Sequence, residues 1–171
     1  PTFGYTSNPA TESTWTSNRL YGMTGTPASS GTVDSISVYA RVTTGSGNIK
    51  AVMVLKSAKT IIADGVGGTV SVTSTSASWR TATYSTAPSV TGGTAYYVCA
   101  VGDAGMDSGK FYFDNTGSTG DAAIDTSNSY TTPTDPTDMT TQARQYGFYA
   151  TYTESGGGGP VVKTLSALGV G

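Results

Sequence analysis

Residues 32–43 read TVDSISVYARVT, and this stretch decides the class of fold. From position 36 onward its even-numbered residues are apolar: Ile36, Val38, Ala40 and Val42. Its odd-numbered residues are polar or amphipathic: Ser35, Ser37, Tyr39 and Arg41. Because side chains alternate between the two faces of a strand, this strict period of two predicts a strand with one buried face and one solvated face.

The sequence that follows predicts a partner for this strand. Residues 44–48 (TGSGN) are turn formers, and residues 49–56 (IKAVMVLK) alternate again, with Ile49, Ala51 and Met53 on one face. Two alternating runs separated by a short glycine-containing loop are typical of a hairpin. We therefore expect these two strands to be hydrogen-bonded neighbours joined by a five-residue loop.

Short strand-like segments continue in both directions, and none has a helical period. The expected strands are residues 18–23, 60–63, 69–73, 79–84, 94–101, 110–114 and 143–153. Only 12% of the residues are charged, against about a quarter in average domains, while the frequent Thr, Tyr and Val suit strands. The sequence predicts an all-β fold, an antiparallel β-sandwich of about eight strands joined by Gly, Pro and Ser turns.

Three segments lie outside the sandwich, which we assign to residues 18–154. Residues 1–17 form an N-terminal arm or a first edge strand, attached to the body by Tyr5 and Trp15. Residues 155–160 (SGGGGP) are a glycine-rich hinge, because glycine runs are flexible and proline is stiff. Residues 161–171 (VVKTLSALGVG) are an apolar docking tail, so the sandwich carries a hinged C-terminal extension.

Several motifs occur in a recognisable order. They are residues 18–22 (NRLYG), 31–39 (GTVDSISVY), 78–84 (SWRTATY), 87–97 (APSVTGGTAYY) and 149–153 (YATYT). This order resembles a jelly-roll domain of phage virion proteins and secreted bacterial proteins, often described as carbohydrate-binding-like. Residues 160–165 (PVVKTL) behind the glycine hinge are similar to tails on phage-encoded copies. The resemblance implies a jelly roll and supplies no catalytic or ligand residue.

Charge and cysteine usage limit the partners and the location. A net charge of −2 with scattered Lys and Arg argues against nucleic acid and anionic membranes, and no apolar run reaches the roughly 20 residues that cross a bilayer. Cys99 is the only cysteine, so it is either a small buried side chain or part of an intermolecular disulfide. The chain begins at Pro1, so either a leader was removed or this is the mature part; we expect an extracellular or virion-surface location.

No set of residues predicts an enzyme. The chain has no histidine, which excludes Ser-His-Asp and Cys-His nucleophiles and removes a common metal ligand. A glycoside hydrolase needs only two carboxylates, but the two glutamates, Glu12 and Glu154, lie in the arm and at the hinge. We therefore predict a protein without catalytic activity.

Calcium is the one metal that the sequence leaves open. Seven of the eleven acidic residues lie between positions 103 and 138, and hard oxygen ligands from loops suit Ca²⁺. The candidate ligands are Asp103, Asp107, Asp114, Asp121 and Asp125. The spacing of an EF-hand is missing, and the alternative is that aspartate simply favours turns.

Aromatic side chains are the candidates for binding glycans. The four rings that we expect to contribute are Trp15, Trp79, Tyr84 and Tyr130. Tyr130 lies in the long polar stretch 114–142 and is the one that we expect to be most exposed. The alternative is that most rings belong to the core of the sandwich.

The tail carries the sharpest functional signal. Its apolar residues are Val161, Val162, Leu165, Leu168 and Val170, and apolar surface tends to be buried. It either folds back on its own sandwich or adds as a strand to a neighbouring subunit, and we favour strand addition. We expect a structural protein on a virion or extracellular filament, such as a capsid decoration, fibre or filament subunit, whose partners are copies of itself or a capsid or filament protein. The alternative is a carbohydrate-binding module.

Overall fold

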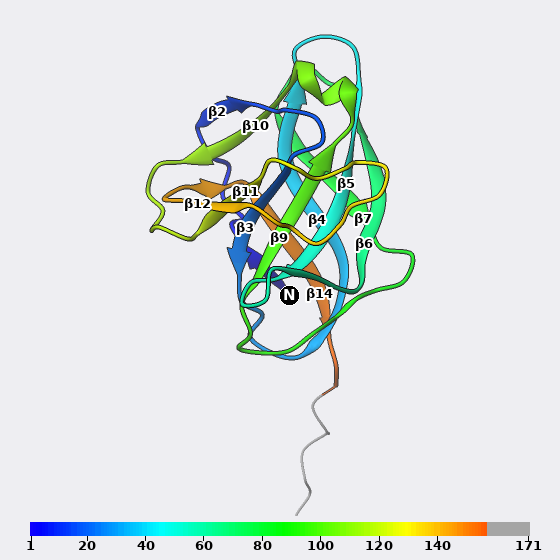
Figure 1. Cartoon of the computed structure of the whole chain (residues 1–171), viewed down its shortest axis with the longest axis vertical. Coiled ribbons are helices and arrows are strands. Elements are labelled where there is room, and N and C mark those ends of the chain that lie inside the picture. The colour runs from blue at the N-terminus through cyan, green and yellow to red at the C-terminus, as the bar shows by residue number, and fades with distance from the viewer. Residues whose placement is uncertain (157–171) are drawn as a thin grey trace, which may run out of the picture.

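The computed structural model describes residues 1–156, and these residues form a β-sandwich (Figure 1). In chain order the strands are β1 (Thr2–Gly4), β2 (Thr11–Thr14), β3 (Leu20–Gly25), β4 (Gly31–Val42), β5 (Gly47–Leu55), β6 (Thr60–Val72), β7 (Ser78–Thr83), β8 (Ser89–Val90) and β9 (Tyr96–Gly102). A short 3-10 helix, Ala104–Ser108, precedes β10 (Gly109–Asp114), β11 (Ala122–Asp125), β12 (Met139–Gln142), β13 (Gln145–Tyr146) and β14 (Phe148–Glu154). No helix in this part of the chain is long and apolar enough to span a membrane.

The strands form two antiparallel sheets. Sheet A has the order β1-β14-β4-β10-β13, with β2 paired to β10 and both β7 and β8 paired to β4. Sheet B has the order β12-β11-β3-β9-β5-β6. The predicted all-β class and the antiparallel sandwich are therefore confirmed.

The opening stretch of the sequence analysis is the central strand of sheet A. β4 pairs with β14 along one side and with β7 along the other. Its even-numbered apolar residues, Ile36, Val38, Ala40 and Val42, are at most 1% exposed and point into the core. The period of two therefore placed the buried face of this strand correctly.

The predicted hairpin is wrong. β4 belongs to sheet A, whereas β5 belongs to sheet B and lies between β9 and β6. The turn at residues 43–46 therefore carries the chain from one sheet across to the other. Alternation tells which face of a strand is buried, but two face-to-face sheets and two neighbouring strands satisfy it equally well.

Apolar side chains are buried on both faces of sheet B. The main core fills the space between the sheets, and a second cluster lies on the outer side of sheet B. This second cluster comprises Leu20, Val52, Val54, Tyr97, Cys99, Val101, Ala123 and Met139. The segment of residues 126–138, drawn in yellow in Figure 1, crosses in front of β3, β9 and β5 and covers it. Residues 126–138, within the long polar stretch, thus form a loop that covers a hydrophobic face of sheet B. We call these residues the cover segment.

The N-terminal residues are built into sheet A. β1 pairs with β14, and β2 pairs with β10. Between them, the buried Pro9 sits against Gly147, where a Cβ would approach the Pro9 ring to 2.9 Å and the Tyr39 Cβ equally closely. A glycine at position 147 therefore lets the arm pass tightly over the junction of β13 and β14.

Candidate functional site

Four aromatic rings gather on the solvent side of sheet A. They come from four different strands: Tyr39 on β4, Trp79 on β7, Tyr112 on β10 and Tyr149 on β14. All four are half-buried, and the neighbours of the three tyrosines along their strands are mostly buried in the core. We call this group the aromatic face.

Strand alternation explains why these rings lie on the outside. Tyr112 stands between the buried Phe111 and Phe113, and Tyr149 follows the buried Phe148. Tyr39 has the same relation to Val38 and Ala40 on β4. Because alternate residues point to opposite faces, each ring must lie on the solvent side of its strand.

The rings contact one another across the sheet. Tyr39 and Trp79 are directly opposite in the register of β4 and β7, with ring centroids 5.2 Å apart. Tyr112 lies 5.3 Å from Tyr39, and Tyr149 lies 4.8 Å from Trp79. The interplanar angles of 54° to 66° are those of tilted and edge-to-face packing, which aromatic pairs prefer over a flat sandwich.

A polar margin borders the aromatic face on the side of β2 and β10. The Arg41 guanidinium donates to the Tyr112 hydroxyl at 2.9 Å and to the Glu12 carboxylate at 2.9 Å. The Tyr112 hydroxyl in turn donates to Glu12 at 3.2 Å. This triad ties the arm strand β2 to the centre of the sheet and fixes the orientation of the Tyr112 ring.

The N-terminal arm between β1 and β2 supplies a second polar margin. The exposed Asn8 accepts a hydrogen bond from the Trp79 indole N–H at 2.8 Å through its side-chain oxygen. Asp114 on β10 accepts from the Ala10 amide at 3.0 Å and from the Tyr5 hydroxyl at 2.5 Å. The arm is therefore held on both sides of Pro9, and the Trp79 indole is fixed by its hydrogen bond.

The pKa values of the groups at the polar margin shift in the directions expected from their contacts. The hydrogen bond from Arg41 lowers the pKa of Glu12, and the same contact raises the pKa of the Arg41 guanidinium. Burial raises the pKa of the Tyr112 hydroxyl. The margin is thus a neutralised ion pair with a protonated phenol at neutral pH, and it offers hydrogen-bonding groups with little net charge.

The sequence-predicted glycan residues do not come together. Trp15 is a correction: its ring is 1% exposed and packs in the core, with centroids 5.2 Å from Tyr21 and 5.7 Å from Phe111. A ring buried between the sheets has no face left for a sugar. Trp79 is the one member of the predicted set that belongs to the aromatic face.

Tyr84 and Tyr130 lie elsewhere. Tyr84 packs over Gly67 against the core, and burial raises the pKa of its hydroxyl well above the ordinary value. Tyr130 lies in the cover segment on the far side of the sandwich, with the Lys50 ammonium 4.8 Å from its ring centroid. Tyr130, expected to be the most exposed of the four, is half-buried because the loop that carries it packs onto sheet B.

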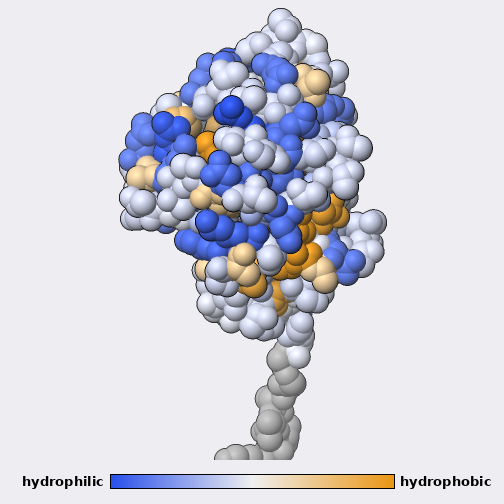
Figure 2. All heavy atoms as spheres, viewed as in Figure 1, coloured by the Kyte–Doolittle hydropathy of each residue, from blue (hydrophilic) through white to orange (hydrophobic). Residues whose placement is uncertain are grey.

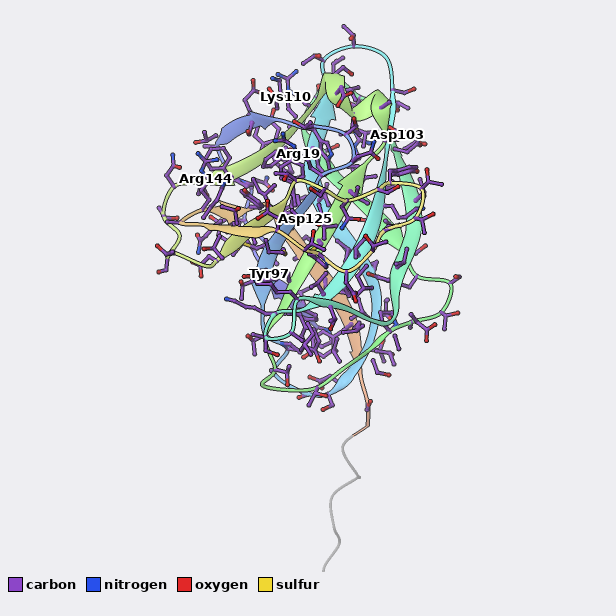
Figure 3. All side chains as sticks on the ribbon, in the orientation of Figure 1. Arg19, Tyr97, Asp103, Lys110, Asp125 and Arg144 are labelled. Atoms are coloured by element: carbon purple, nitrogen blue, oxygen red, sulfur yellow. The ribbon has the colours of Figure 1, made fainter. Side chains whose placement is uncertain are left out.

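The structure does not bring the candidate calcium ligands together. Asp103 binds the Asn48 amide and side chain, whereas Asp107 binds Ser17, and Figure 3 shows Asp103 well apart from Asp125. Asp121 accepts from the Ser118 amide three residues earlier. Within residues 1–156 no three acidic or cysteine side chains cluster as metal ligands would. Asp121 and Asp125 bond nearby backbone amides, as the turn interpretation expects, whereas Asp103, Asp107 and Asp114 bond groups far away in the sequence.

Asp125 has the most structural of these roles. It is 1% exposed and accepts hydrogen bonds from the Ser127 amide at 3.2 Å and from the Asn128 side chain at 2.9 Å. Asn128 also donates to the Thr134 carbonyl at 3.0 Å. These bonds fasten the cover segment, and Figure 3 places Asp125 and Tyr97 on this side of the sandwich.

Cys99 and the C-terminal tail were the subjects of two other predictions from the sequence. Cys99 is fully buried in the second cluster, where burial raises the pKa of its thiol, so the thiol has no access to a second chain. The predicted tail residues Val161, Val162, Leu165, Leu168 and Val170 lie outside the described residues.

Tyr39, Tyr112 and Tyr149 were not among the site residues predicted from the sequence. A signal for them existed, because each is an aromatic residue at the solvent parity of a strand whose buried parity is apolar. Sequence alone could not show that the three strands lie side by side. Chemically, such rings with hydrogen-bonding neighbours can stack on the apolar faces of flat, uncharged ligands. No pocket opens in the described part of the chain, so a ligand would lie on the surface.

No protein-family model matches the sequence, and no curated protein matches it.

Proposed function

We propose that this protein is a non-enzymatic glycan-binding module that holds an extended, neutral polysaccharide on its aromatic face. The observation that carries the proposal is the convergence of Tyr39, Trp79, Tyr112 and Tyr149 on the solvent side of one sheet. The four rings are half-buried, so each keeps part of its surface toward solvent, where an aromatic side chain can stack on a ligand.

The shape of the surface supports a chain-like ligand. A flat face without a pocket cannot enclose the end of a sugar chain, but it can contact several consecutive units of a polymer. The rings supply stacking surfaces, and the margin supplies donors and acceptors for hydroxyl groups.

The charge of the margin supports a neutral ligand. Arg41 already pairs with Glu12 and Tyr112, so it offers no free positive charge to a uronic acid or a sulfate. Lys110 on β10 donates to the Thr14 hydroxyl at 2.8 Å, which holds its ammonium in place without removing its charge. A polymer rich in hydroxyl groups fits this surface better than an anionic one.

The test is affinity electrophoresis of the whole chain in gels containing a soluble neutral polysaccharide, with cellulose-type glucan, xylan and mannan as separate probes. We expect retardation by at least one of them and loss of that retardation in Trp79→Ala, by about tenfold in affinity for one lost stacking contact. Tyr130→Ala is the matched control, because it removes an aromatic ring from the other side of the molecule.

Two outcomes would count against glycan binding. One is migration unchanged by every neutral probe, together with no signal on a glycan array. The other is equal loss of retardation in Trp79→Ala and Tyr130→Ala, which would point to instability instead of a binding site.

The structural role expected from the sequence is a second candidate, and the two are compatible in a protein on the surface of a virion or an extracellular filament. The observation that favours it is an apolar strip on β6, at the end of the sandwich where the chain leaves the described region. The mass in solution of the full chain, compared with a version ending at Glu154, tests it by light scattering.

A further inference from the structure

The first strand segment of β6 exposes apolar side chains. Val66 is 41% exposed, the one large hydrophobic residue counted as exposed among residues 1–156, and Ala63 beside it is exposed as well. Ile61 is half-buried against the second cluster on the outer side of sheet B, whereas Ile62 packs against the main core between the sheets. Figure 2 shows hydrophobic atoms gathered on this part of the surface, in the lower half of the view. We call Ile61, Ala63 and Val66 the β6 strip.

The β6 strip lies at the end of the sandwich where the described chain ends. The Ser155 amide donates to the Ser30 carbonyl at 2.9 Å, and the Ser30 hydroxyl accepts from the Gly92 amide at 3.0 Å. The loop that begins there reaches Ala95, whose carbonyl accepts from the Lys56 amide at 3.2 Å. Lys56 opens the turn that leads into β6, so these loops gather at one end of the molecule.

The chain leaves this end into open space. Ser155 and Gly156 are exposed, and a Cβ built on Gly156 would meet no atom within 4 Å. Figure 1 shows the last described residues running away from the body, continuing the direction of β14. The described chain therefore ends at an exposed position at this end of the molecule.

The sequence beyond this point matches the β6 strip in chemistry. Residues 161–168 (VVKTLSAL) contain four large apolar residues and one charge, Lys163. Asp64 lies within the β6 strip, is exposed, and has no hydrogen-bond or ion-pair partner among the described residues. The strip thus offers apolar side chains and one anion, and residues 161–168 carry apolar side chains and one cation.

We propose that residues 161–168 of one copy pack on the β6 strip of a second copy, with Lys163 next to Asp64. The donor segment and the receptor strip are different surfaces of the chain, so the contact is head-to-tail. A contact of this kind makes rings when its rotation closes and filaments when it does not. The inference is independent of glycan binding, since it uses the other sheet.

We expect this contact to be held by side-chain packing more than by a continuous ladder of backbone hydrogen bonds. The edge of β6 is partly occupied, because the Ile61 amide donates to the Asp135 carboxylate at 2.7 Å. The Gly65 carbonyl accepts from the Tyr84 hydroxyl at 3.4 Å. Covering edge groups in this way is how sheets avoid unspecific pairing, and it leaves the side chains of the strip as the accessible feature.

The experiment is a complementation test by light scattering over a range of concentrations. Three proteins are compared: the full chain, the chain ending at Glu154, which lacks the donor segment, and full-length Val66→Asp, which spoils the receptor strip. Val66 is exposed, so the substitution leaves the core intact, and Ala63→Asp is a second variant of the same kind. Thr141→Asp on β12 is the matched control, since it adds the same charge to the opposite edge of sheet B.

We expect the full chain and Thr141→Asp to form oligomers, and the truncated chain and Val66→Asp each to be monomeric, with self-association at least tenfold weaker. An equal mixture of the last two retains one good donor and one good receptor, so it gives heterodimers and nothing larger. Oligomers that persist in both Val66→Asp and Ala63→Asp would overturn the proposal. So would a full chain that is monomeric at every concentration and resists trypsin at Lys163, because the segment then docks on its own sandwich.

Discussion

The outer faces of the two sheets differ in the side chains that they carry and in how much of them the rest of the chain covers. On sheet B the outward side chains are apolar, including Leu20, Val52 and Val54, and the cover segment buries them. On sheet A the outward side chains are rings and polar groups, and only the short N-terminal arm touches them. A covered face contributes to stability, whereas an uncovered face with large rings is available to a ligand, so one sandwich separates folding from recognition.

The largest expected effect lies on the covered face. Leu20 is fully buried under the cover segment, so Leu20→Ala should lower the free energy of unfolding by about 2–5 kcal/mol, because it removes buried methyl groups and leaves a cavity. Urea denaturation followed by tryptophan fluorescence measures this change. A loss below about 1 kcal/mol would mean that the face is not packed as described.

A smaller effect should follow from loosening the cover segment. Asn128→Ala removes the side-chain donor to the buried Asp125, and an unsatisfied buried acceptor costs about 1–3 kcal/mol. Because Cys99 lies beneath this layer and burial raises the pKa of its thiol, the wild-type thiol should react slowly with an aromatic disulfide reagent. The rate should rise in Asn128→Ala, while Trp79→Ala should leave it unchanged.

On the aromatic face, a substitution should reduce ligand affinity more than it reduces stability. Trp79→Ala removes a half-buried ring with two aromatic neighbours, so we expect it to cost about 1 kcal/mol of stability. The loss of glycan affinity should be the larger consequence. If thermal unfolding instead shows a loss as large as that of Leu20→Ala, the aromatic face is a second core and the comparison between the two sheets fails.

The smallest effect concerns the acid side of the pH scale. Arg41 lowers the pKa of Glu12 below the value of 4.5 that a free glutamate has. A carboxyl whose pKa is lower in the folded state stabilises the fold above its unfolded pKa, and this contribution is lost as the pH falls through the folded pKa. Glu12→Gln should therefore lower the melting temperature slightly at pH 7 and leave it unchanged near pH 2. Both residues are solvent-accessible, so the difference should shrink in high salt.

The two tryptophans differ in burial, and their local sequences do not predict this difference. Both were candidates for the same glycan site, and the local sequence of neither contains the answer. Trp15 follows β2 and enters the core only because β2 pairs with β10 and leads the chain between the sheets. Trp79 reaches the outer face because β7 pairs with β4 in a register that sets it opposite Tyr39.

Three features could be predicted from the amino-acid sequence alone: the class of fold, the buried face of β4 and the lack of histidine-dependent chemistry in these 171 residues. These follow from alternation and composition, which are local properties of the chain. Three other features became visible in the folded chain: β4 and β5 lie in different sheets, residues 126–138 cover sheet B, and Tyr39, Tyr112 and Tyr149 join Trp79. The physical reason is that the period of a strand fixes the direction of its side chains, whereas the neighbours of a strand are chosen by long-range packing of the whole chain.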